Sequence, residues 1–85
     1  MEIIYDSHAS GRLAERADQL GISIDDALGR VKETLLLGNV SKSKRSRRNL
    51  VYCKYFHDNT SFFVVCKRRG RRILIKTVII KEGRE

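Results

Sequence analysis

The chain has 85 residues, of which 41% are hydrophobic and 33% are charged, and its formal net charge at pH 7 is +8. This length allows one domain with a single modest core, and the apolar content excludes a disordered tail. The apolar runs are too short to span a membrane and the N-terminus lacks a signal-peptide pattern, so we expect a cytoplasmic protein without membrane contact. The basic balance favours a polyanionic partner.

Two amphipathic helices are predicted after a short strand-like segment at the N-terminus. The first is capped by Asp6 or Ser7 and runs to about Leu20. The second is capped by Ser23 and stopped by the Gly-Asn pair at 38–39. Both helices carry apolar residues at intervals of three or four positions, so each is expected to bury one face.

The second half of the chain is predicted to form a basic loop and three strands. Residues 41–49 are polar, basic and without periodicity, and we expect a mobile loop there. Strands are predicted at Leu50–His57, Phe62–Lys67 and Ile73–Lys81, with turn signals between them. The expected fold is a single α+β domain over 1–85, with two N-terminal helices packed on one face of a small antiparallel β-sheet and the N-terminal segment as a candidate edge strand.

The two turns also predict a register for the strands. A two-residue loop at 59–60 pairs Cys53 with Cys66, and a two-residue loop at 70–71 places Thr77 on the same face as both cysteines. We expect two reduced core thiols there rather than a disulfide. The face with fewer charges is assigned to the helices, and it comprises Val51, Cys53, Tyr55, His57, Phe62, Val64, Cys66, Ile73, Ile75, Thr77 and Ile79.

His8, Arg12 and Arg16 recur at four-residue intervals, which places them on one line of the first helix at the border between helix and sheet. One interpretation is a solvated flank, in which the arginines pair with carboxylates such as Glu15 or Asp18. The other is a functional site, in which His8 transfers a proton and the arginines hold a phosphate. The spacing alone leaves both interpretations open.

The functional interpretation has a chemical basis in RNA cleavage without a metal. Such cleavage needs one group that takes the 2′-hydroxyl proton, one that protonates the leaving oxygen, and cations that stabilise charge on phosphorus. His8, the two arginines and the Thr77 hydroxyl form a minimal set. DNA lacks the internal nucleophile, so this set points to RNA, and we expect neither a metal nor a cofactor.

The sequence HASGRLAERADQLGISIDDAL, followed by a basic loop, a strand meander and ILIKTVII, resembles a family of small bacterial and phage domains related to the BrnT/RelE-like ribonuclease toxins, which have the barnase–EndoU–colicin–RelE fold. The resemblance covers about 4–80. In related toxin domains a helix histidine, a basic residue and a strand hydroxyl gather in a cleft between helix and sheet. The resemblance therefore implies catalytic roles for His8, Arg12, Arg16 and Thr77.

Basic residues are concentrated in the second half of the chain. Residues 1–41 carry four Lys/Arg and seven Asp/Glu, a net charge of −3, whereas 42–85 carry fourteen and three, a net charge of +11. The alternative to nucleic-acid binding is that lysine and arginine keep the surface hydrated and block edge pairing. We favour contacts to nucleic-acid phosphates by Lys42, Lys44, Arg45, Arg47, Arg48, Lys54, Lys67, Arg68, Arg69, Arg71, Arg72 and Lys76.

These observations predict a metal-independent endoribonuclease of the toxin type, acting on RNA alone or on the ribosome. Its expected protein partner is an acidic antitoxin that covers the basic surface. One alternative is a non-catalytic nucleic-acid-binding regulator of the same fold, such as a phage or plasmid protein. Another is an interaction module whose charge serves a protein partner.

Overall fold

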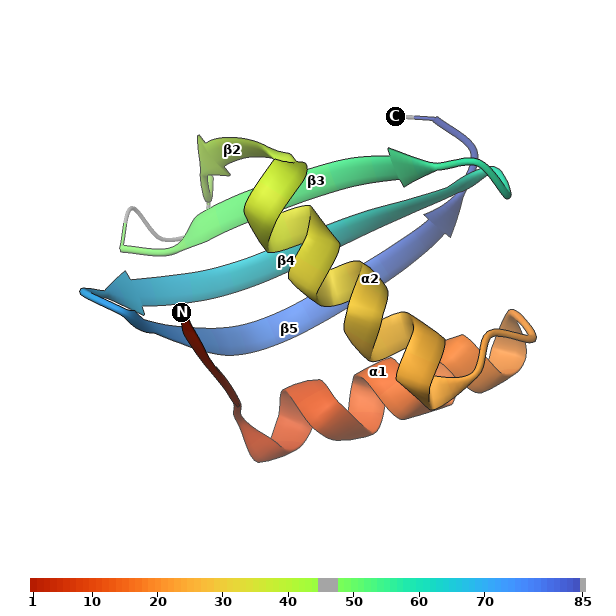
Figure 1. Cartoon of the computed structure of the whole chain (residues 1–85), viewed down its shortest axis with the longest axis horizontal. Helices are drawn as coiled ribbons and strands as arrows, with labels where there is room; N and C mark the ends of the chain where they lie inside the picture. Colours follow the sequence, from red (N-terminus) through yellow and green to blue (C-terminus); the bar gives the residue numbers. More distant parts are fainter. Residues whose placement is uncertain (45–47, 85) are drawn as a thin grey trace.

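Two helices lie on one face of a mixed sheet (Figure 1). The computed structural model of the chain describes residues 1–44 and 48–84. Within them the sheet has five strands in the order β1-β5-β4-β3-β2, with β1 parallel to β5 and the other neighbours antiparallel. The elements in chain order are β1 (Glu2–Tyr5), α1 (Ser7–Gln19), α2 (Ile24–Leu37), β2 (Asn39–Lys42), β3 (Leu50–Phe56), β4 (Thr60–Arg69) and β5 (Arg72–Glu82).

The predicted α+β class is confirmed, with two differences in the sheet. The N-terminal strand does join an edge, but it is parallel to β5, so the sheet is mixed rather than antiparallel. The predicted loop at 41–49 begins too early, because Ser41 and Lys42 belong to β2 and pair with Val51 and Leu50. Neither described helix has the length and apolar content to cross a membrane.

Local capping interactions define both helices. The Asp6 carboxylate accepts a hydrogen bond from the Ala9 amide at 3.1 Å, so Asp6 is the cap of α1. The Ser23 hydroxyl accepts one from the Asp26 amide at 3.1 Å, which confirms the predicted cap of α2. Gly21 has a φ of 71°, a conformation that glycine adopts without steric cost, and it turns the chain between the helices.

The predicted register between β3 and β4 is wrong. Phe56 pairs with Thr60, which leaves a three-residue loop between them. Asn59 has a φ of 65° in this loop, a left-handed conformation that asparagine tolerates better than most residues. The register differs from the expected one by an odd number of positions, so each β3 side chain lies on the opposite face from the one predicted. Cys53 is therefore half-buried on the helix-free face while Cys66 is buried beneath the helices, and the two cysteines form no disulfide.

A bulge in β5 changes the register a second time. Next to the turn the prediction is correct, because Cys66 pairs with Ile75. Beyond this pair Lys76 is an extra residue, and Val65 pairs with Thr77. Thr77 therefore lies on the helix-free face, and its predicted place under the helices is wrong.

The bulge keeps apolar side chains of β5 under the helices along its whole length, because Val78 takes the place that Thr77 would occupy in an unbulged strand. Ile79 lies on the helix-free face with 42% of its surface exposed, and Val78 and Ile80 turn inward instead. The core between the helices and the sheet comprises Ala9, Leu13, Ala17, Ala27, Val31, Leu35, Tyr52, Phe62, Val64, Cys66, Ile73, Ile75, Val78 and Ile80.

Arg30 ties α2 to the turn between β3 and β4. Its guanidinium pairs with Asp26 at 3.1 Å and with Asp58 at 2.7 Å. It also donates to the Thr60 hydroxyl at 3.0 Å and lies 5.8 Å from the centre of the Phe62 ring. Only 17% of the Arg30 side chain is exposed, so these contacts hold the helix over one end of the sheet.

Two adjacent isoleucines test the bulge. Replacing Ile80 by alanine should lower the free energy of unfolding by about 2–5 kcal/mol, because the side chain is fully buried. Replacing Ile79 by alanine should cost less than about 1 kcal/mol, because Ile79 is exposed to solvent. Urea denaturation of both variants measures the difference. A larger loss of stability for Ile79→Ala than for Ile80→Ala would instead support a strand without the bulge.

The carboxylate of Asp58 predicts a pH dependence of stability. A hydrogen bond from the Thr60 hydroxyl, together with the ion pair to Arg30, lowers the pKa of Asp58 below its ordinary value. A lowered pKa in the folded state stabilises the fold above the ordinary value of about 3.9, and this contribution disappears as the pH falls through the folded pKa. The stability difference between wild type and Asp58→Asn should therefore be constant near neutrality and shrink below about pH 5. Urea denaturation at several pH values measures it, and a pH-independent difference would contradict the assignment.

Candidate nucleic-acid interface

The edge of β5 is covered first by β1 and then by α1. The last residue of β1, Tyr5, pairs with Ile75, and the Asp6 amide donates to the Ile75 carbonyl at 3.2 Å. The chain then enters α1, which runs beside the remainder of β5 (Figure 1). The Arg16 Nε donates to the Ile80 carbonyl at 3.2 Å, so an arginine of α1 satisfies part of the edge that β1 does not reach.

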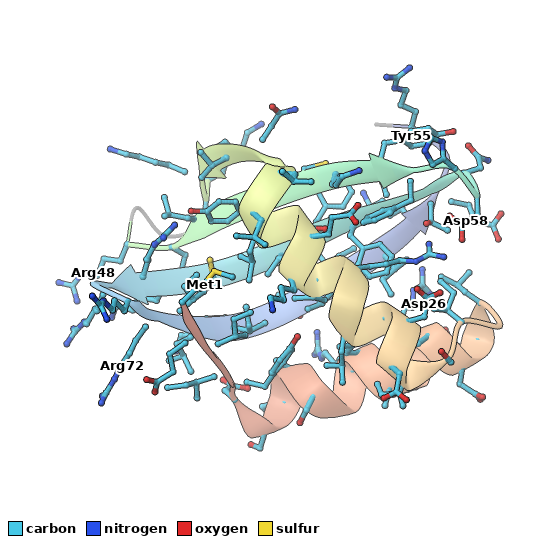
Figure 2. The ribbon with its side chains drawn as sticks, viewed as in Figure 1. Met1, Asp26, Arg48, Tyr55, Asp58 and Arg72 are labelled. Carbon is cyan, nitrogen blue, oxygen red and sulfur yellow. The ribbon has the colours of Figure 1, made fainter. Side chains whose placement is uncertain are left out.

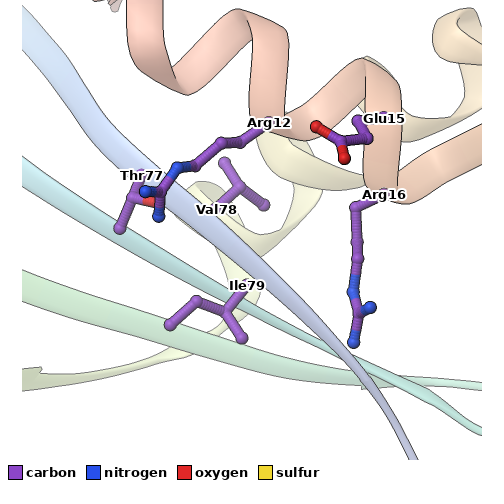
Figure 3. Close-up of a pocket in the computed structure, with 6 residues that line it drawn as sticks. All are labelled: Arg12, Glu15, Arg16, Thr77, Val78 and Ile79. Carbon is purple, nitrogen blue, oxygen red and sulfur yellow. The ribbon is translucent and has the colours of Figure 1, made fainter.

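A pocket of about 250 Å³ lies where α1 meets this edge. We call it the β5-edge pocket. Figure 3 shows the Arg12 guanidinium beside Thr77, while Arg16 extends toward the strand on the other side of the pocket. The residues that line it are Arg12, Glu15, Arg16, Thr77, Val78 and Ile79.

Two groups of the β5-edge pocket that can donate a hydrogen bond to an anion are available to a ligand. The Arg12 guanidinium and the Thr77 hydroxyl make no hydrogen bond or ion pair within residues 1–44 and 48–84. Arg16 is held differently, because it donates to the Gln19 side chain at 3.1 Å as well as to the Ile80 carbonyl. The expected alternative of arginines paired with carboxylates of their own helix is thus not what α1 shows for either arginine in the described part of the chain.

The structure brings three of the four predicted catalytic residues together. Arg12, Arg16 and Thr77 line one pocket, although Thr77 comes from the face opposite to the one expected. It reaches the pocket because it follows the bulge on the strand that α1 flanks. His8 is exposed on α1 and does not line the pocket. Its Cβ atom lies one helical turn from that of Arg12, which corresponds to about 6 Å.

Glu15 is a pocket residue that the sequence did not identify as one. From the sequence, Glu15 was expected only as an ion-pair partner of the arginines. Its carboxylate in fact borders the same pocket as Arg12 and Arg16. Its position one turn of helix from Arg12 was the signal that could have placed it there.

The pocket continues onto the helix-free face of the sheet, which we call the open face. A central hollow of about 430 Å³ shares Thr77 and Ile79 with the β5-edge pocket. The side chains that line it come from rows of paired residues on neighbouring strands, for example Val51, Val65 and Thr77. The residues that line the central hollow are Ser43, Asn49, Val51, Phe63, Val65, Thr77, Ile79 and Lys81.

Basic side chains surround a second hollow at one end of the open face. This basic hollow has a volume of about 350 Å³ and lies beside the turn between β4 and β5. Figure 2 shows Arg48 and Arg72 at this end of the sheet, with Tyr55 and Asp58 at the other. The residues that line the basic hollow are Ile4, Lys67, Arg69, Arg72, Leu74 and Lys76.

The remaining basic candidates divide between the two faces. Lys54 was expected on the outer face, but it lies under α2, where its ammonium pairs with Glu33 at 3.2 Å. Arg68 also lies on the helix side and donates to the Tyr52 hydroxyl at 3.0 Å. The other described candidates are exposed in β2, in the segments beside the undescribed residues and in the turn before β5: Lys42, Lys44, Arg48 and Arg71. Arg45 and Arg47 lie outside the described residues.

No group of three or more His, Cys, Asp and Glu side chains in the described part of the chain is placed to hold a metal ion. Comparisons of the chain with protein-family models, curated proteins and solved structures gave no match. The resemblance to the ribonuclease toxins therefore stays a prediction, and the function is inferred from the residues of the site.

Proposed function

We propose that the protein binds RNA, with one phosphate in the β5-edge pocket and the rest of the ligand on the open face. The observation that carries this proposal is the convergence of the Arg12 guanidinium and the Thr77 hydroxyl, both unpaired among the described residues, in a pocket that adjoins the central hollow of the open face. A guanidinium donates two parallel hydrogen bonds to phosphate oxygens, and a hydroxyl completes the contact. Arg16 adds a second positive charge at the same pocket, so two cations face the single negative charge of Glu15 there.

The basic hollow supplies the electrostatic attraction for a longer ligand. Its four cations, Lys67, Arg69, Arg72 and Lys76, lie on the same face as Thr77. A polyanion that covers both hollows releases counterions when it binds these cations, so affinity falls as salt rises. RNA is preferred over DNA in this proposal because the Thr77 hydroxyl lies beside the phosphate site, within reach of a 2′-hydroxyl. An RNA ligand agrees with a cytoplasmic location.

Removing the Arg12 charge should weaken RNA binding in a salt-dependent way. Arg12→Gln should flatten the slope of log affinity against log salt by about 0.7, because one phosphate contact is lost. Lys32→Gln is the matched control, since it removes one exposed charge from α2, away from the pocket. Fluorescence anisotropy with labelled single-stranded RNA between about 50 and 200 mM salt measures both slopes.

Two results would contradict the proposal. Wild-type protein without salt-dependent RNA affinity would refute RNA binding, and tight binding to an acidic protein instead would assign the basic surface to a protein partner such as an antitoxin. If Arg12→Gln and Lys32→Gln changed the salt slope equally, the β5-edge pocket would not be the phosphate site.

Endoribonuclease activity is a second candidate function, favoured by the position of His8 one helical turn from a pocket that holds Arg12, Arg16 and Thr77. In this reaction the RNA 2′-oxygen attacks the adjacent phosphorus and the bond to the 5′-oxygen breaks. A base takes the 2′-hydroxyl proton and an acid gives a proton to the leaving 5′-oxygen. The products are a 2′,3′-cyclic phosphate and a 5′-hydroxyl, and the arginines stabilise the charge that develops on the phosphoryl oxygens.

The two histidines of the chain provide a test of cleavage. His8→Ala should lower the cleavage rate by roughly 10²–10⁴-fold, the usual effect of removing a proton-transfer group, with RNA affinity unchanged. His57→Ala, at the exposed turn between β3 and β4, is the control and should cleave like wild type. Gel analysis of RNA incubated with EDTA measures both. Wild-type protein that binds RNA and does not cut it would instead support the non-catalytic regulator.

A further inference from the structure

We propose that the open face takes the bases of a single strand and that Phe63 is the ring on which one base stacks. This inference rests on the proposed RNA binding and names the form of nucleic acid that the surface selects. The choice lies between a duplex, which a protein contacts mainly through its backbone, and a single strand, whose bases are free to meet the protein.

Phe63 occupies the middle of the open face. It lies in the cross-strand row that also contains Cys53 and Ile79, and it lines the central hollow. Neither helix of the described part of the chain covers this face, because α1 and α2 both pack on the other side of the sheet (Figure 1). Its ring is therefore an aromatic group that lies partly exposed on a broad sheet surface, as in the stacking surfaces of proteins that bind single strands.

The distance from Phe63 to the proposed phosphate site suits one nucleotide. Phe63 pairs with Ile79, and Thr77 lies two residues earlier on the same strand. Such diagonal neighbours in an antiparallel pair are about 7–8 Å apart. A nucleotide joins its phosphate and its base through one sugar, so a phosphate held by Arg12 and Thr77 at the strand edge places the attached base toward the centre of the sheet.

The surface around Phe63 is unsuited to a duplex. The central hollow is lined largely by apolar side chains, including Val51, Val65 and Ile79, while the cations lie at its margins. A duplex presents phosphates and sugars outward, so it would place polar groups against this apolar centre. A single strand instead turns its bases inward and its phosphates toward the margins.

The environment of the ring also favours nucleic acid over a protein partner. The Lys81 ammonium lies 5.5 Å from the centre of the Phe63 ring. An apolar anchor from a protein would bury or displace this cation at a cost in free energy. Lys81 lies on the other side of Phe63 from Thr77, so a nucleotide stacked on the remaining ring surface leaves this cation beside the next phosphate of the strand, where the charge is favourable.

The experiment compares Phe63 variants on single-stranded and double-stranded RNA. Phe63→Leu keeps an apolar side chain and removes the ring, and we expect it to lower the affinity for a roughly twelve-nucleotide single strand by about ten-fold. Leu36→Ala is the control, because it trims an exposed apolar side chain of α2, on the other side of the sheet, without touching the open face. The wild type should bind the single strand more tightly than a hairpin duplex with the same number of phosphates.

A tryptophan at position 63 reports stacking directly. The chain contains no tryptophan, so Phe63→Trp introduces a single indole, which can be excited selectively over the three tyrosines. Its fluorescence should be quenched on binding the single strand, and this variant should keep wild-type affinity because it retains an aromatic ring. The signal does not depend on how well Phe63→Leu folds.

The outcomes separate this inference from the proposed function. Salt-dependent binding that is equal for duplex and single strand, without tryptophan quenching or an effect of Phe63→Leu, would overturn the stacking site and leave RNA binding intact. Absence of binding to any nucleic acid, with binding to an acidic protein, would overturn both.

Discussion

The extra residue Lys76 in β5 decides what each face of the sheet presents. Before Lys76, β5 pairs with β4 in the register set by the turn that joins them. After Lys76 the register shifts by one residue, so Val78 and Ile80 point into the core. The same shift moves Thr77 and Ile79 to the open face, where they join the two hollows that a ligand would meet. The bulge also follows directly on the last pair between β1 and β5, so α1 takes over the strand edge at this point and brings its arginines with it.

Among the described residues, positively charged side chains are paired with carboxylates on the helix side of the sheet and largely unneutralised around the basic hollow on the open face. On the helix side, Lys54 pairs with Glu33, and Arg30 pairs with Asp26 and Asp58. Such pairs reduce the charge that a ligand would sense. Around the basic hollow, the described residues make one ion pair, which is long and exposed and therefore contributes little. The described cations of the basic hollow thus keep most of their positive charge on the open face, which is the face with an apolar centre.

Local signals in the sequence were sufficient for the helices and insufficient for the register. Ser23 caps α2 through a hydrogen bond to a neighbour three residues away, so the pattern carries the information. The turn at Asn59 depends on one residue in a left-handed conformation, and a two-residue alternative was equally compatible with the sequence. The bulge is less visible still. An unbroken alternation from Ile73 to Ile79 is also apolar except at Thr77, so the sequence alone does not exclude it. The choice depends on packing against α1, a contact between distant parts of the chain. Thr77 therefore lines a pocket with Arg12 and Arg16, but from the face opposite to the one assigned from the sequence.

The distribution of strand lengths has a consequence for self-association. The two longest strands, β4 with 10 residues and β5 with 11, carry most of the backbone groups that could template growth of the sheet. β4 is paired on both sides, and β5 is paired with β1 before the bulge and flanked by α1 after it, where Arg16 bonds the Ile80 carbonyl. The strands left at the margins of the sheet, β1 and β2, have 4 residues each. A short margin offers few consecutive hydrogen bonds to another chain, so the architecture itself opposes fibre-like stacking of neighbouring molecules.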